Sequence, residues 1–183
     1  PNDYKNITLV FNDVDTMPYL KNFLNYKTTS GNVKHFYGYK FALGGIVSIT
    51  GADFEKTLGF PNFWAWGYED NMLKQRVDKQ KLSIDYGQFY PIMDKNILQL
   101  KDGLQKFVNR GEFDTFNSKS NNTGYHTIIN LTYEINEITG FVDVKTFDTE
   151  KRNNPNEHVS YDLRKGNRPF NTGRRGGGMR MLL

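Results

Sequence analysis

Residues 7–15 read ITLVFNDVD, a short apolar and β-branched run that stops in an acidic turn. A continuous run of this kind is typical of a strand buried on both faces of a sheet. Ligands of open α/β sheets bind outside the carboxyl ends of the strands, so Asp13 and Asp15 are well placed to meet one. Their hard oxygen atoms suit Mg²⁺ or Mn²⁺, and such an ion can bridge a carboxylate and a diphosphate. An ordinary turn explains the same triplet, because Asp and Asn form local hydrogen bonds in turns.

Further segments with the pattern of a strand lie in the first and in the second half of the chain. Residues 33–41 mix aromatic and β-branched side chains and predict an extended segment, and residues 46–49 predict a second strand. Residues 125–135 and 141–147 predict a β-hairpin, whereas the Asn-, Ser- and Gly-rich residues 117–124 predict a loop.

Two helices are predicted between these strands. Thr50, with Asp53 three residues later, is typical of a capped helix start, and Gly59 is typical of the end of that helix. Glu69 and Asp70 predict the start of a second helix, because acidic side chains stabilise the positive end of the helix dipole.

The composition excludes several classes of site. The 183 residues fit one globular domain, and the absence of cysteine excludes disulfides, thiolate zinc sites and cysteine nucleophiles. A cysteine-free chain suits a reducing compartment such as the cytoplasm. No apolar run approaches the roughly 20 residues of a membrane-spanning helix, so the sequence predicts no transmembrane segment.

The positive charge is concentrated at one end of the chain. The net charge is +4, but residues 151–183 hold eight Lys and Arg against two acidic residues, so residues 1–150 carry a net −2. The sequence therefore predicts a folded body over residues 1–150 and a disordered, basic, Gly- and Arg-containing tail over residues 151–183. A solvated terminus explains this tail better than contact with nucleic acid or a membrane.

A second group of chemically informative residues lies at 59–71, which reads GFPNFWAWGYEDN and holds both tryptophans of the chain. A core anchor followed by acids at a helix start explains the pattern in structural terms. A sugar site explains it as well, because an aromatic ring stacks on the C–H face of a pyranose while carboxylates accept hydrogen bonds from the sugar hydroxyls. The sequence leaves both interpretations open.

Three segments in this order resemble the β-1,4-galactosyltransferase family: FNDVD at 11–15, FALGGIVS at 41–48, and GFPN running into WAWGYED at 59–70. The resemblance extends over residues 7–80. It implies an α/β fold of the GT-A type, a Rossmann-like nucleotide-sugar domain, with residues 1–150 as the catalytic portion. It also implies a location in the Golgi lumen. The family has an Arg-rich nucleotide-binding segment well before the DVD motif, so we expect the fold to be incomplete at the N-terminus of this chain.

The activity implied by the resemblance is inverting transfer of a hexose from a UDP-sugar to a hydroxyl of a glycan or glycoconjugate acceptor, with Mn²⁺ or Mg²⁺ as cofactor. Asp70 matches the catalytic base, and Asp15 matches the principal metal ligand. The remaining matched positions border the donor or the acceptor: Asp13, Val14, Ala42, Gly44, Gly45, Trp66, Gly67, Glu69 and Asn71.

Ala42 takes the place where galactose-specific members carry a Tyr that crowds the C2 substituent of the donor sugar. An Ala there opens that wall, so we expect the site to accept N-acetylgalactosamine as well as galactose.

The sequence also departs from the family pattern. The family completes its metal site with a Met-x-x-His segment, whereas this chain has Met93 followed by Asn96 in place of the His. Ala65 and Tyr68 stand where the family has glycines, and Asn71 stands where it has an acid. Recognition of the family's acceptor by this chain therefore does not follow from the resemblance. The alternative function is therefore a non-catalytic relic of the same fold that binds a carbohydrate or a nucleotide-sugar.

Overall fold

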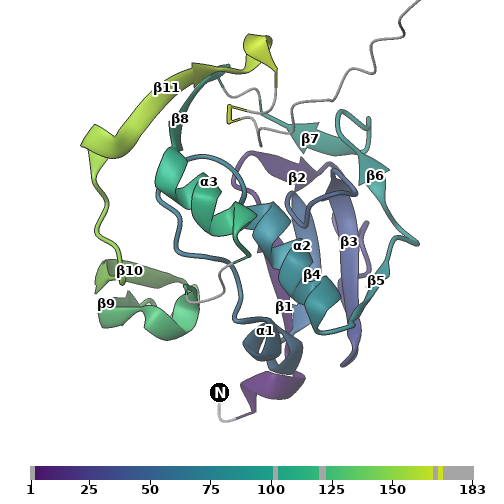
Figure 1. The fold of residues 1–183 in the computed structure, drawn as a ribbon. Helices are drawn as coiled ribbons and strands as arrows, with labels where there is room; N and C mark the ends of the chain where they lie inside the picture. The colour runs from purple at the N-terminus through teal and green to yellow at the C-terminus, as the bar shows by residue number, and fades with distance from the viewer. Residues whose placement is uncertain (1–2, 101–102, 120–122, 167–168, 171–183) are drawn as a thin grey trace, which may run out of the picture.

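The computed structural model describes residues 3–100, 103–119, 123–166 and 169–170 (Figure 1). Its centre is a mixed sheet of five strands. The main order is β1 (Thr8–Asn12), β4 (Ile46–Thr50), β3 (Asn32–Gly38) and β5 (Ser83–Asp85), and β6 (Tyr90–Pro91) pairs with β3. Strands β1 and β3 both run antiparallel to β4, whereas β5 and β6 run parallel to β3.

The prediction that residues 7–11 form a strand buried on both faces is wrong. Strand β1 lies at the edge of the sheet, and none of its side chains is fully buried. Leu9 and Phe11 pack against the core, but Val10 between them is 43% exposed, because successive side chains of a strand point to opposite faces. The strand with all residues buried is β4, which has a neighbour on each side.

Both predicted helices are present beside the sheet, where α2 crosses in front of β3 and β4 (Figure 1). Helix α1 (Gly51–Thr57) is capped by Thr50, whose hydroxyl oxygen accepts a hydrogen bond from the Asp53 N–H at 3.2 Å. Helix α2 (Glu69–Lys79) begins at Glu69 as predicted. Its buried Leu73 and Val77 join a core cluster with side chains of β3 and β4.

A second group of contacts on strands β3 and β4 comes from irregular segments and from short strands. Phe36, Tyr37 and Ile46 form a second buried cluster there with Leu24 and Ile97. The central strands are thus buried on both sides, which gives the acidic turn after β1 a rigid support.

The second half of the chain forms smaller pieces around this centre. Strand β2 (Thr16–Pro18) pairs with β7 (Ile97–Gln99), and β8 (Gln105–Asn109) leads into helix α3 (Arg110–Asn117). Strands β9 (Ile129–Ile135) and β10 (Val142–Asp148) form the predicted hairpin, although its first strand begins at Ile129 and not at Tyr125. Single turns of 3-10 helix complete the described elements: Tyr4–Asn6, Tyr125–Thr127, Pro155–Glu157 and Leu163–Lys165.

Part of the predicted disordered tail is ordered. Strand β11 (His158–Asp162) pairs antiparallel with β8, and Val159 lies opposite Val108. Residues 158–162 alternate polar and apolar side chains, a strand signal that the basic, Gly- and Arg-containing composition of the whole tail concealed. Residues 171–183 of the tail lie outside the described residues, and the boundary at residue 150 stays a prediction. Within the described part of the chain, no helix has the length and apolar character needed to cross a bilayer.

Candidate active site

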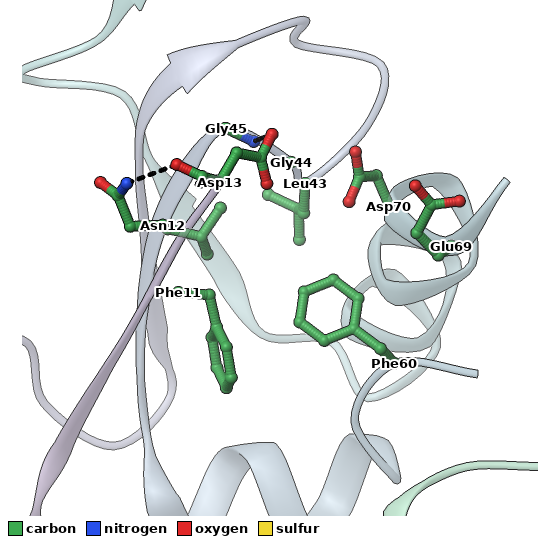
Figure 2. Close-up of a pocket in the computed structure, with 10 residues that line it drawn as sticks. Phe11, Asn12, Asp13, Leu43, Gly44, Gly45, Phe60, Glu69 and Asp70 are labelled. Atoms are coloured by element: carbon green, nitrogen blue, oxygen red, sulfur yellow. Dashed lines mark hydrogen bonds between the residues drawn. The ribbon is translucent and has the colours of Figure 1, made fainter. Parts of the chain in front are cut away.

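A cavity of about 250 Å³ lies where the end of β1, the start of β4 and the first turn of α2 meet (Figure 2). The carboxylates of Asp13, Glu69 and Asp70 reach it from these elements, and Phe11 and Phe60 lie below them. The same three carboxylates also border a larger cavity of about 830 Å³. The small cavity is therefore the acidic end of a longer site.

The turn at Gly45 holds Asp13 in place. The Asp13 N–H donates to the Gly45 carbonyl oxygen at 2.8 Å, and the Gly45 N–H donates to Asp13 Oδ2 at 3.0 Å. Gly45 has a φ of +74°, and a Cβ there would lie 2.3 Å from the Tyr37 carbonyl oxygen. Only glycine fits both the conformation and the space, so this turn fixes one carboxylate across the sheet.

Gly44 performs a similar role for Asp70. A Cβ on Gly44 would lie 1.9 Å from Asp70 Oδ2, and the Leu43 N–H donates to the Asp70 carbonyl oxygen at 3.0 Å. The backbone of the Gly-Gly turn thus packs directly against the carboxylate of Asp70 (Figure 2).

His35 supports this turn from the core, a role that the sequence did not predict. Its ring is fully buried, and Nε2 lies 2.9 Å from the Tyr37 carbonyl oxygen and 3.0 Å from the Gly44 carbonyl oxygen. Because both partners are acceptors, Nε2 carries the proton. Burial lowers the pKa of His35, which keeps the ring neutral. The signal in the sequence was a histidine in the middle of the apolar segment 33–41.

The acidic end of the site favours protonated carboxylates. Burial, followed by the nearby charges of Glu69 and Asp13, raises the pKa of Asp70 from 3.8 to about 7. Burial is also the main cause that raises the pKa of Glu69. An acid whose pKa lies near 7 can accept or donate a proton at neutral pH, which is what general acid–base chemistry requires.

The larger cavity has an aromatic wall. The rings of Tyr39 and Phe41 are stacked with centroids 5.0 Å apart, and both side chains are largely exposed. Trp66 is 39% exposed, and the ammonium group of Lys106 lies 6.0 Å from the centroid of its ring. Exposed aromatic faces beside carboxylates suit a ligand with both C–H faces and hydroxyl groups, as sugars have.

The structure brings most of the predicted site residues together. Val14 is not among them, because its side chain is fully exposed and lines neither cavity. Asn96 is also elsewhere, and its amide group donates to Asp94 Oδ1 at 2.8 Å. Ala42 lines the larger cavity, although only 7% of its surface is exposed. The predicted residues that border the larger cavity are Asp13, Asp15, Ala42, Gly44, Gly45, Trp66, Gly67, Glu69, Asp70, Asn71 and Met93.

The described residues do not complete a metal site. Within the described ranges, no group of three or more His, Asp or Glu side chains is placed to hold an ion. Asp15 offers one carboxylate, and Met93 is largely exposed with a φ of +68°. The ligand roles of Asp15, Met93 and Asn96 therefore stay predictions.

Comparisons with known proteins agree with the geometry of the first half of the chain. The family model described as the N-terminal domain of galactosyltransferase matches residues 25–95. β-1,4-Galactosyltransferase 6 of Homo sapiens is 38% identical over 80 residues, which cover 38% of this chain and 20% of the relative. β-1,4-Galactosyltransferase 5 of Sus scrofa is 37% identical over 87 residues, which cover 42% of this chain and 22% of the relative. The chain spans about a fifth of the length of these curated relatives.

Solved structures extend the likeness to the fold. The catalytic domain of Drosophila β-1,4-galactosyltransferase 7, in complex with xylobiose, matches with a TM-score of 0.57 and 19% identity over 79% of this chain and 68% of that chain. A mutant of that enzyme, in complex with manganese, UDP-Gal and xylobiose, matches with a TM-score of 0.56 and 18% identity, with the same coverage. The predicted α/β fold of the GT-A class is confirmed. In sequence, the chain is similar to the β-1,4-galactosyltransferase family, and the family model covers residues 25–95.

Proposed function

We propose that this chain forms part of an inverting hexosyltransferase that moves galactose from a UDP-sugar to an acceptor hydroxyl, with Asp70 as the catalytic base. The observation that carries the proposal is the position of Asp70. Its carboxylate has a pKa near 7 and forms part of the acidic end of the larger cavity, which also has an aromatic wall. The solved neighbours hold UDP-Gal and xylobiose, which supports this class of donor and acceptor.

In an inverting displacement, a base accepts the proton of the acceptor hydroxyl while that oxygen attacks the anomeric carbon and UDP departs. The deprotonated Asp70 accepts that proton, and the neighbouring Glu69 and Asp13 favour its retention. The transition state should have oxocarbenium character by analogy with glycoside hydrolysis. Trp66 and Tyr39 offer faces on which the sugar rings can stack.

The donor proposal rests on Ala42. It presents a methyl group where a ring would narrow the cavity, so we propose that the site accepts UDP-GalNAc alongside UDP-Gal. One small apolar change alters discrimination by only about 1 to 3 kcal/mol, so we expect tolerance rather than a complete switch. Ala42→Tyr should depress use of the N-acetylated donor more than use of UDP-Gal.

The metal requirement is a separate proposal. A bound Mn²⁺ would stabilise the departing diphosphate, and Asp15 is the residue we expect to hold it. Because the described residues do not provide a complete set of metal ligands, no step above depends on the ion. The same incompleteness favours the second candidate function, a non-catalytic module that binds a carbohydrate or nucleotide-sugar. Calorimetric titration with UDP, with and without Mn²⁺, on the native chain and Asp15→Ala separates the two, because metal-independent binding favours the module.

The decisive experiment measures UDP release from UDP-Gal with xylobiose as acceptor. Asp70→Asn keeps the shape of the side chain but removes proton acceptance, so transfer should fall by roughly 10² or more, with donor binding little changed. Asp78→Asn is the matched control, because Asp78 lies in the last turn of the same helix, in an exposed ion pair with Lys74. Near-native transfer by Asp70→Asn would show that Asp70 is only an acid at a helix start. A location in the Golgi lumen, implied by the resemblance, stays a prediction.

A further inference from the structure

The loop between residues 62 and 67 brings Trp66 to the larger cavity and leads directly into the acids at the start of α2. It has no regular secondary structure, so its backbone N–H groups need partners from other elements. Three consecutive N–H groups find them on the segment that runs from β8 into α3. This segment lies outside the residues 25–95 that match the family model.

Glu112, in the first turn of α3, provides two of these contacts. Its Oε1 accepts from the Trp64 N–H at 2.6 Å, and its Oε2 accepts from the Ala65 N–H at 3.1 Å. The residue is only 9% exposed. Asn109 caps the helix and orients this turn, because its side-chain oxygen accepts from the Glu112 N–H at 3.2 Å.

The third contact continues along the same segment. The Trp66 N–H donates to the Phe107 carbonyl oxygen at 2.7 Å. Residues 64, 65 and 66 are therefore each hydrogen-bonded to the stretch from Phe107 to Glu112, and these three bonds anchor the loop from which Trp66 reaches the cavity.

We propose that Glu112 is a positioning residue, which fixes the Trp66 wall of the cavity by holding the two backbone N–H groups that precede it. Glu112 lines neither cavity, so its effect passes through the loop. The nearby charge of Glu112 also raises the pKa of Glu69, although burial and the charge of Asp13 contribute more. The part of the proposal that concerns sugar binding rests on the proposed function, whereas the anchoring of the loop does not.

If Glu112 had only a structural role, its removal would lower the stability of the fold, as the loss of any buried and hydrogen-bonded carboxylate does, and would not change the loop in particular. Asp53 provides the matched control for that effect. It is fully buried and accepts from the Gly31 N–H at 2.7 Å and from the Thr50 hydroxyl at 2.9 Å, but it lines neither cavity. Removing either carboxylate should destabilise the protein, but only one of them holds the loop.

The test uses the native fluorescence of the full chain. Both tryptophans of the sequence, Trp64 and Trp66, lie in this loop, so indole emission and its quenching by acrylamide report on the loop alone. Glu112→Ala should shift the emission to longer wavelength and increase quenching, under conditions where circular dichroism shows a folded protein. Glu112→Gln keeps one carbonyl oxygen to accept from one N–H and should show a smaller change. Asp53→Asn should lower the denaturation midpoint and leave the indole signal as it is in the native chain.

Xylobiose binding, followed by the same emission, should weaken about tenfold in Glu112→Ala, the equivalent of one lost charge-assisted hydrogen bond. If Glu112→Ala does not fold, Glu112→Gln decides the matter with the same readouts. Emission and quenching that equal those of the native chain, or that change equally in Asp53→Asn, would overturn the proposal. A native chain that binds neither xylobiose nor UDP-Gal, with the indole changes as expected, would contradict the proposed function and leave the positioning role supported.

Discussion

Strand β4 and the hairpin of β9 and β10 are both predicted as strands from the sequence, but they have opposite surroundings. Every residue of β4 is buried, because β1 and β3 flank it and α2 and a second core cluster cover its two sides. Every residue of β9 is exposed, and so is all of β10 except Asp148. A strand predicted from its apolar residues is therefore expected to be stable and rigid only where other strands or helices pack against it.

The two walls of the candidate site lie on parts of the molecule that differ in this way. Asp13, Gly44 and Asp70 are attached to the covered sheet and to α2, so they stand on the stable part of the molecule. Trp66 lies on a loop anchored by later elements. The hairpin itself meets that loop through Phe147 and Trp64. The reacting acids and the aromatic wall therefore depend on parts of unequal stability.

The largest expected effect tests the comparison directly. Leu73 in α2 is fully buried in the core cluster, and Leu73→Ala should lower the free energy of unfolding by about 2–5 kcal/mol. Val144 in β10 is half exposed, and Val144→Ala should change it by about 0.5 kcal/mol or less. Urea denaturation measures both, and equal losses would mean that the hairpin is covered as well as the sheet is.

A pH series should show an intermediate effect that belongs to the covered part alone. The pKa of Asp70 is about 7 in the folded protein, against the ordinary 3.8 of an aspartate, so the folded state binds this proton more tightly. The stabilisation is complete below about pH 4 and is lost as the pH rises through 7, by up to a few kcal/mol. Asp70→Asn should flatten this dependence and become more stable than the native chain at pH 8.

The control for the pH series is Val144→Ala, which removes no charge and should keep the native pH profile. Urea midpoints between pH 4 and pH 8 give both curves. Burial also lowers the pKa of His35, which stabilises the folded state as the pH rises, so the contribution of Asp70 is the difference between the native and Asp70→Asn curves. Parallel curves for these two proteins would contradict the raised pKa of Asp70.

Sequence reasoning succeeded where the signal is local. The cap at Thr50, the start of α2 at Glu69 and the two strands of the hairpin follow from neighbouring residues, and all of them are confirmed. It failed where the partner lies far along the chain. The edge position of β1 depends on the strands beside it, and the order within residues 151–166 depends on the pairing of β11 with β8.

The same limit applies to the site. The acids and glycines could be predicted, since they carry a recognisable motif, and the structure places most of them around one cavity. His35 and Glu112 carry no motif, because their roles come from contacts with Gly44 and with Trp64, which lies 48 positions before Glu112. Buried polar residues of this kind can be identified only after the topology is known.

The smallest expected effect concerns the junction of the two regions. The rings of Trp64 and Phe147 are nearly parallel, with centroids 5.7 Å apart and an interplanar angle of 5°, and both side chains are partly exposed. Trp64→Leu also loses the hydrogen bond from its indole N–H to the Lys151 carbonyl oxygen, so single variants cannot isolate the stack. A double-mutant cycle with Phe147→Leu should give a coupling energy of about 0.5–1 kcal/mol by urea denaturation. The stacked pair Phe11 and Phe54, with centroids 4.8 Å apart beside the buried core, is the reference and should couple at least as strongly. Zero coupling between Trp64 and Phe147 would show that this stack does not link the hairpin energetically to the loop that carries Trp66.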